Sequence, residues 1–94
     1  MPERMNFEFV PGPEPLVGYI ETNLELIDGA AEHYADMAAA AEGSFVAQLL
    51  SGVEGVRAFT LESKRMVLER DPDESTDWDS IALQIIGILR EEFL

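Results

Sequence analysis

The strongest constraint on the fold is a change of hydrophobic period inside residues 44–70. The first part of this stretch has the spacing of one helical face, with apolar residues at Phe45, Val46, Leu49, Leu50 and Val53. From Val56 the pattern alternates with a period of two up to Leu61, and a second strand-like run extends from Met66 to Arg70. The stretch therefore predicts a helix of about ten residues followed by a β-hairpin.

Residues typical of helix boundaries flank the predicted helix. Ser44 occupies the N-cap position, where its hydroxyl can accept a hydrogen bond from a backbone N–H group of the first turn. Gly52 and Gly55 follow the apolar face, and glycine readily adopts the left-handed backbone that ends many helices. We therefore expect the helix to stop near Val53. The polar residues 62–65 then form the tip of the hairpin.

The N-terminal third predicts strands. Residues 5–10 alternate in polarity, and residues 11–15 end this short strand, because their three prolines lack the N–H groups that a sheet requires and have a fixed φ. Residues 16–29 fit either a helical face or an alternating strand. The strand is slightly favoured because Thr22 and Asn23 are poor residues for the middle of a helix.

The alanine-rich segment 30–43 and the C-terminal segment predict further elements. Alanine favours a helix in residues 30–43, and a short strand at 33–36 before a loose helical segment is the alternative. After an acidic connector at 71–77, Thr76 or Asp77 caps a final helix. One face of that helix is apolar: Trp78, Ile81, Ala82, Ile85, Ile86, Leu89 and Phe93.

These elements predict an α+β fold in which two helices cover one face of an antiparallel sheet of about four strands. The expected order is strand, strand, helix, strand, strand, helix. A chain of 94 residues suits one domain, residues 1–94, with one hydrophobic core. We expect a monomer.

The acidic composition argues against several classes of partner. Nineteen Asp and Glu residues oppose six Lys and Arg residues, which gives a formal net charge of −13. Such a charge repels nucleic-acid phosphates and anionic membranes, so we expect no binding to either. Adaptation to high salt and docking onto a basic partner both remain open explanations for the acidity. No apolar run approaches the roughly 18 residues of a membrane span, and the first residues do not read as a signal peptide, so we expect a cytoplasmic protein.

No pattern in the sequence indicates a metal centre or a catalytic site. There is no cysteine, which excludes disulfides and thiolate ligands within these residues. Residues 71–77 have the spacing with which a calcium loop begins, but Thr76 and Ala82 replace its turn glycine and its bidentate glutamate. His33 is the single histidine and is interpreted as structural. We expect no cofactor, no metal and no enzymatic activity.

Four motifs follow one another along the chain: Phe9-Val10-Pro11-Gly12, Ser44-Phe45-Val46-Ala47, Val53-Glu54-Gly55-Val56 and Asp77-Trp78. In this order they resemble the N-terminal domain of NifU/Nfu-type iron–sulfur scaffold proteins. That family shows K-F-x-P-G, S-P-L-A-x-x-L-F, a G-V turn and an acidic residue before Trp at these places. The resemblance covers nearly the whole chain and implies a domain linked to iron–sulfur cluster assembly.

The resemblance implies recognition of a protein rather than transport of a cluster. The cluster-binding C-x-x-C of the family lies in a separate C-terminal domain, so we expect a non-catalytic accessory domain whose partner is an assembly factor or a client protein. Glu8 stands where the family has lysine, and with Phe9 it is a candidate for contact with the partner. Lys64 and Arg65 are further candidates, because they place two of the few cations at the hairpin tip. The alternative is an acidic antagonist, such as an immunity or nucleic-acid-mimic protein, of a basic partner.

Overall fold

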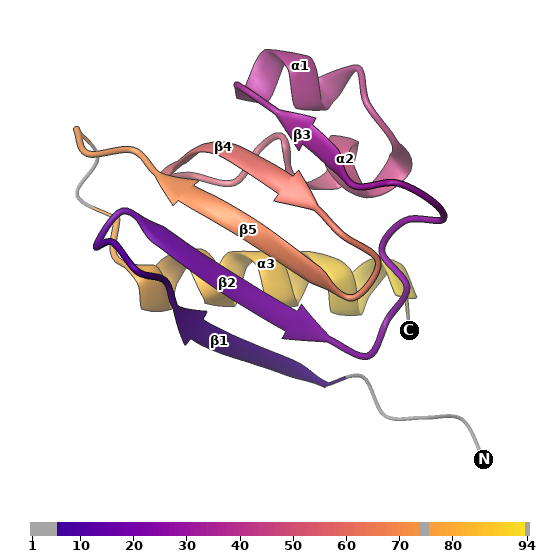
Figure 1. Cartoon of the computed structure of the whole chain (residues 1–94), viewed down its shortest axis with the longest axis horizontal. Coiled ribbons are helices and arrows are strands. Elements are labelled where there is room, and N and C mark those ends of the chain that lie inside the picture. The colour runs from indigo at the N-terminus through magenta and orange to yellow at the C-terminus, as the bar shows by residue number, and fades with distance from the viewer. Residues whose placement is uncertain (1–5, 74–75, 94) are drawn as a thin grey trace.

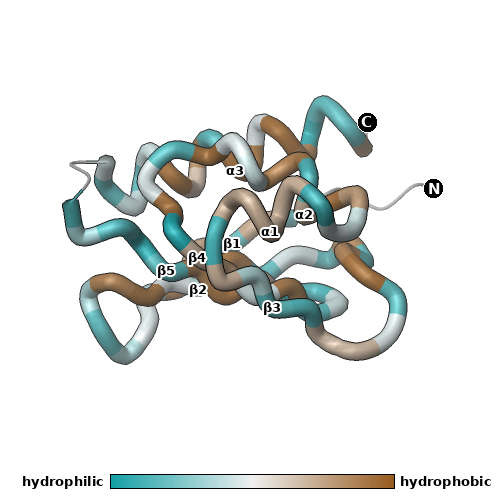
Figure 2. The backbone as a smooth tube through the Cα atoms, turned by 90° about the horizontal axis from the view of Figure 1, so that it is seen from above, coloured by the Kyte–Doolittle hydropathy of each residue, from teal (hydrophilic) through white to brown (hydrophobic). Residues whose placement is uncertain are grey.

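A computed structural model describes residues 6–73 and 76–93 (Figure 1). Five strands form one sheet in the order β1-β2-β5-β4-β3, and every neighbouring pair is antiparallel. Helices α2 and α3 lie on one side of this sheet, and its other side carries no helix of the described residues (Figures 1 and 2). The α+β class is confirmed, and the sheet has one strand more than predicted. The elements are β1 (Phe7–Pro11), β2 (Val17–Thr22), β3 (Glu32–Tyr34), α1 (Met37–Ala41), α2 (Phe45–Leu50), β4 (Val56–Leu61), β5 (Arg65–Arg70) and α3 (Trp78–Phe93).

The ambiguous segment 16–29 begins as strand β2 and continues as an irregular connection. Ile20 and Thr22 are buried toward the helices, as the strand interpretation predicts, so the helical alternative is wrong. After the strand, Leu26 donates its backbone N–H to the Ser63 carbonyl at 2.7 Å, and Leu26 and Ile27 extend the core. The connection is therefore held by backbone pairing and by buried apolar side chains.

The alanine-rich segment supplies the additional strand and a third helix. Strand β3 pairs with β4, so the alternative of a short strand before a helix is correct. Helix α1 follows at once, because the Asp36 carboxylate accepts a hydrogen bond from the Ala39 N–H at 2.7 Å and caps its first turn. Ala40 is fully buried and anchors this helix, while most of the other alanines are exposed.

Helix α2 differs from its prediction in length, capping and face. It covers six residues rather than about ten. Ser44 stands at the N-cap, but its hydroxyl is buried without a hydrogen-bond partner, and its backbone N–H donates to the Tyr34 hydroxyl at 3.3 Å. Phe45 is 57% exposed, whereas Val46, Ala47 and Leu50 are buried. The predicted cap bond from the Ser44 hydroxyl is therefore wrong, and a hydrogen bond to Tyr34 on β3 holds the chain at the start of α2 instead.

The exit from α2 uses one of the two predicted glycines. Val53 donates its N–H to the Leu50 carbonyl at 3.1 Å, which closes a tight final turn. Gly55 then adopts a φ of 91°, a left-handed conformation that suits glycine, before β4 begins. The φ angle of Gly52 is not in the left-handed region, so Gly52 does not serve as the left-handed residue.

The predicted hairpin is confirmed and contains a bulge. The register of β4 and β5 shifts between Val56 and Ala58, which leaves Arg57 on the exposed side. Because of this extra residue, Val56 lies opposite Arg70 and joins the core, where strict alternation would direct it outward. Ala58 keeps its outward register opposite Glu69, although little of it is exposed. A bulge depends on the partner strand and was not predicted from alternation alone.

The predicted C-terminal helix is confirmed as α3. Asp77 is its cap, since the Asp77 carboxylate accepts from the Ser80 N–H at 2.9 Å. Trp78 packs its ring 5.3 Å from that of Phe9 and donates its indole N–H to the Pro15 carbonyl at 3.0 Å. The helix buries three residues fully against the sheet: Ile81, Ile85 and Leu89. None of the helices within residues 6–73 and 76–93 has the length and apolar character needed to cross a membrane.

Candidate functional site

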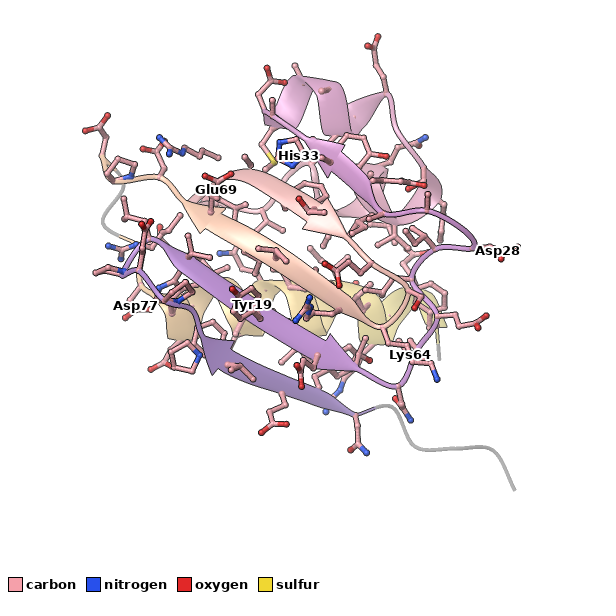
Figure 3. The ribbon with its side chains drawn as sticks, viewed as in Figure 1. Tyr19, Asp28, His33, Lys64, Glu69 and Asp77 are labelled. Carbon is pink, nitrogen blue, oxygen red and sulfur yellow. The ribbon has the colours of Figure 1, made fainter. Side chains whose placement is uncertain are left out.

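The side of the sheet opposite α2 and α3 is a continuous surface that we call the open face. The strand register aligns one row of side chains across all five strands: Val10, Tyr19, Val67, Thr60 and His33. A neighbouring row consists of Glu8, Glu21 and Arg65. Figure 3 looks onto this side, with Tyr19 near its middle. The open face is defined by these two rows together with Glu69, which opposes Val17 and Ala58, and its ion-pair partner Arg57.

The middle of the open face is apolar. Val10, Tyr19 and Val67 are neighbours in the central row and are all half-buried. An antiparallel sheet with one solvated side usually carries polar residues there, because only its other side packs against a core. Two valines and a tyrosine at outward positions therefore need another explanation, and contact with a partner provides one.

A stacked arginine lies beside this apolar centre. The Arg65 guanidinium lies 5.3 Å from the centre of the Tyr19 ring. Glu62 holds it there, because Arg65 Nε and one terminal nitrogen donate to the two Glu62 carboxylate oxygens at 3.1 and 3.2 Å. A two-point bond of this kind fixes the guanidinium plane. Tyr19 and Arg65 are of the residue types that contribute most to protein interfaces, and here they are already ordered.

The side of the open face near β3 and β4 is polar. His33 Nδ1 lies 2.8 Å from the Thr60 hydroxyl, which orients the imidazole along the row. Arg57 and Glu69 form an ion pair at 3.7 Å. Figure 3 labels His33 on β3 and Glu69 on β5, the two strands that flank β4. Within the described part of the chain, no group of three His, Asp or Glu residues is placed to hold a metal ion.

An open cleft lies where the open face meets the hairpin tip. Its volume is about 610 Å³. Glu8 and Glu21 are directly opposite in the β1–β2 register, and like charges in such positions are unfavourable. Neither carboxylate has an ion-pair partner within 4 Å among the described residues. The cleft is lined by Asn6, Phe7, Glu8, Glu21, Thr22, Asn23 and Lys64.

The structure brings three of the four predicted contact residues together. Lys64 and Glu8 line the same cleft, and Arg65 lies next to it, opposite Glu21 in the register. Phe9 lies apart from them, because alternation along β1 directs its ring to the helix side, against Trp78. Whether these residues contact a partner stays a prediction.

The sequence analysis did not select the apolar centre of the open face. Tyr19 and Val67 stand at positions that the alternation directs outward, where polar residues are usual. Within each strand separately, the sequence already showed an apolar residue at an outward position. Only the register, which makes β2 and β5 neighbours, shows that the two side chains form one patch.

The acidic connector has a role in capping. Hydrogen bonds from the Ser80 backbone and hydroxyl lower the pKa of Asp77 below its ordinary value, and the positive charge of Arg70 acts in the same direction. Asp71 likewise accepts from the Asp73 N–H at 2.9 Å, which forms a local turn. The calcium-like spacing in residues 71–77 places oxygen side chains at alternate positions, and the third of these, Ser75, lies outside the described residues.

Comparisons with known proteins bear on the fold. No protein family matches this sequence, and no curated protein is significantly similar to it. The structure is similar to the solution NMR structure of a NifU-like protein from Saccharomyces cerevisiae, with a TM-score of 0.74. The match covers 97% of this chain and 82% of that chain at 15% sequence identity. The chain therefore has the fold of a NifU-like protein, as the resemblance implied.

Proposed function

We propose that this chain is a non-catalytic protein-recognition domain that serves iron–sulfur cluster assembly and binds its partner through the open face. The observation that carries the proposal is the apolar centre at Val10, Tyr19 and Val67, with Arg65 held over the Tyr19 ring by two hydrogen bonds to Glu62. The sequence motifs shared with NifU/Nfu-type scaffold proteins and the NifU-like fold support the link to cluster assembly.

The shape and chemistry of the open face favour a protein as the ligand. A broad sheet surface offers contact area but no deep enclosure, and small-molecule sites are usually concave. Arg65 is held by a two-point bond to Glu62, so a partner meets a prearranged guanidinium there. We assign no cluster to this chain, because its 94 residues contain no cysteine to ligate iron. Its contribution is to bring a scaffold, carrier or client protein into place.

Site-specific photocrosslinking tests the proposal. In one variant, p-benzoylphenylalanine replaces Tyr19 on the open face. In the matched control it replaces Leu83, which is 71% exposed on α3. After irradiation in a native lysate, we expect an iron–sulfur assembly factor or a cluster-carrying client to be attached at position 19 and not at position 83. Adducts at position 83 alone, or no adduct at position 19, would contradict the proposal.

The net charge of −13 supports a second candidate, an acidic antagonist that neutralises a basic protein. The two candidates differ in the salt dependence of binding. A complex based on charge should weaken about tenfold or more between about 0.02 and 0.15 M salt, because screening grows over this range. A complex formed on the apolar centre should weaken by less than about threefold. Capture of a single basic toxin or nuclease with steep salt dependence would favour the antagonist.

A further inference from the structure

The two edges of the sheet differ in how much free backbone they present. The outer strands are β1 and β3. β3 has only three residues, so it offers few backbone groups to an added strand. Helix α1 follows β3 directly and lies on its side of the sheet (Figure 1). The β1 strand has five residues, and Figure 1 shows no described element beyond it. An added strand would therefore find more free backbone at β1.

The hydrogen-bond pattern identifies the backbone groups that are free on β1. Gly12 donates to the Val17 carbonyl at 3.0 Å, so this pair is a hydrogen-bonded pair of the antiparallel ladder. Such pairs occur at every second residue, so Val10 and Glu8 also bond to β2. The N–H and C=O groups of Phe7 and Phe9 consequently point away from the sheet.

The β1 edge carries few of the features that protect edge strands from pairing. Proteins commonly protect edges with lysine, bulges or proline. β1 contains no lysine, and its register with β2 is continuous through all five residues. Pro11 is the exception, and it lies at the end of the strand, where it limits how far an added strand can pair. The N–H groups of Phe7 and Phe9 remain available.

Charge indicates what kind of strand would pair there. The charged residues that line the cleft at the start of β1 are Glu8, Glu21 and Lys64, so acids outnumber the cation. Glu8 and Glu21 oppose each other, and neither has an ion-pair partner within 4 Å among the described residues. A cationic side chain entering the cleft would relieve their repulsion. A second copy of this chain is a poor occupant, because each copy carries a net charge of −13.

We infer that the β1 edge binds an extended, basic segment of a partner protein as a sixth strand of the sheet. The main chain of that segment pairs with Phe7 and Phe9, and one of its lysine or arginine side chains enters the cleft beside Glu8 and Glu21. This inference rests on the proposed function, since it states how a protein partner docks. Main-chain pairing supplies affinity, and the cleft supplies selectivity for a basic sequence.

Amide hydrogen exchange tests this mode of binding. The probe is a synthetic peptide of about eight residues in which lysine alternates with valine, a pattern suited to a strand. At saturating peptide, exchange of the Phe7 and Phe9 amides should slow by about tenfold or more, because a new hydrogen bond protects them. The His33 amide at the opposite edge should exchange as before. A peptide with glutamate in place of lysine should give no protection at the same concentration.

Two charge-reversal variants separate the cleft from the overall charge. Glu8→Lys places a cation in the cleft, and we expect it to weaken peptide binding by about fivefold or more. Glu42→Lys makes the same change of net charge at an exposed position beside α1, and we expect less than about a twofold effect. Equal effects of the two variants would overturn the inference, because binding would then follow net charge alone.

Other results of the peptide experiment would also decide against the β1 inference. Absence of peptide binding, or binding without protection of the Phe7 and Phe9 amides, would overturn the β1 inference. Protection of these amides by self-association, seen as a doubled mass in the absence of peptide, would also overturn it. None of these three results changes the expected crosslinking at Tyr19, so the proposed function can hold even if the β1 inference fails. If position 19 gives no adduct while the amides become protected, the open-face proposal fails and edge binding remains.

Discussion

Val67 and Leu68 are adjacent residues of β5 that point to opposite sides of the sheet, so their truncation tests whether the open face is free. Leu68 is 1% exposed and belongs to the core, whereas Val67 is half-buried on the open face. Leu68→Ala removes buried carbon atoms and leaves a cavity, for which the expected loss of unfolding free energy is about 2–5 kcal/mol. Val67→Ala removes two methyl groups that are partly in contact with water, so its loss should stay below about 1 kcal/mol.

Thermal unfolding followed by circular dichroism distinguishes the two variants. In a domain of this size, each 1 kcal/mol lowers Tm by about 4–8 °C. A loss of about 3 kcal/mol for Leu68→Ala therefore corresponds to a fall of about 12–24 °C. The Tm of Val67→Ala should fall by less than about 8 °C. Urea titration of both variants checks the order, because the midpoint shifts in proportion to the lost free energy while the slope stays constant.

Equal destabilisation by Val67→Ala and Leu68→Ala would refute this reasoning. Such a result would mean that Val67 is as deeply covered in solution as Leu68, for instance by a second copy of the chain. A small effect of Leu68→Ala would refute the assigned core instead. Measuring Tm at two protein concentrations separates these explanations, since only an oligomer has a Tm that depends on concentration.

Two further predictions concern the turns that position α3 and β4. Hydrogen bonds from Ser80 lower the pKa of Asp77 in the folded state. The ionised Asp77 carboxylate therefore stabilises the fold at pH values above the unfolded-state pKa, which is near 3.8. This contribution is lost as the pH falls through the lower pKa of the folded state. The Tm difference between wild type and Asp77→Ala should therefore be constant near neutral pH and shrink in acid, and a difference that grows in acid would contradict the assignment. Gly55→Ala should lower the unfolding free energy by more than about 1 kcal/mol, because φ is 91° and the new Cβ would lie 2.8 Å from the Thr76 Cβ. The control Gly52→Ala, whose Cβ would meet nothing within 4 Å, should change it by less than about 0.5 kcal/mol in urea titration.

The elements predicted best are those whose apolar pattern is long and locally complete. Helix α3 has an apolar residue at nearly every turn, and Asp77 caps it through a bond to a residue three positions away. The hairpin of β4 and β5 is also local in sequence. The features that were missed depend on distant residues. The Ser44 N–H donates to Tyr34, ten residues earlier in the chain, and the bulge at Arg57 requires the register of the partner strand.

In the candidate site, too, the residues that stand out locally were predicted, and the features that depend on distant residues were not. The charged residues Glu8, Lys64 and Arg65 stood out in the sequence because cations are rare in this chain and because Glu8 departs from a family motif. The patch formed by Tyr19 and Val67 did not, since strand order decides which outward residues become neighbours. Residues 16–29 fitted both a helix and a strand, and the outward position of Tyr19 followed only from the favoured strand interpretation.

The dissociation constant of the partner identified by crosslinking gives the most direct test of the open face as a recognition surface. It is measured for wild type, for Tyr19→Ala and for Leu83→Ala at one ionic strength. Loss of a central tyrosine at an interface commonly costs about 2 kcal/mol or more, so we predict at least about thirtyfold weaker binding for Tyr19→Ala. Leu83→Ala should bind within about twofold of wild type, because Leu83 lies on the far side of the molecule, on α3. Unchanged affinity of Tyr19→Ala, or a larger loss for Leu83→Ala, would contradict the account.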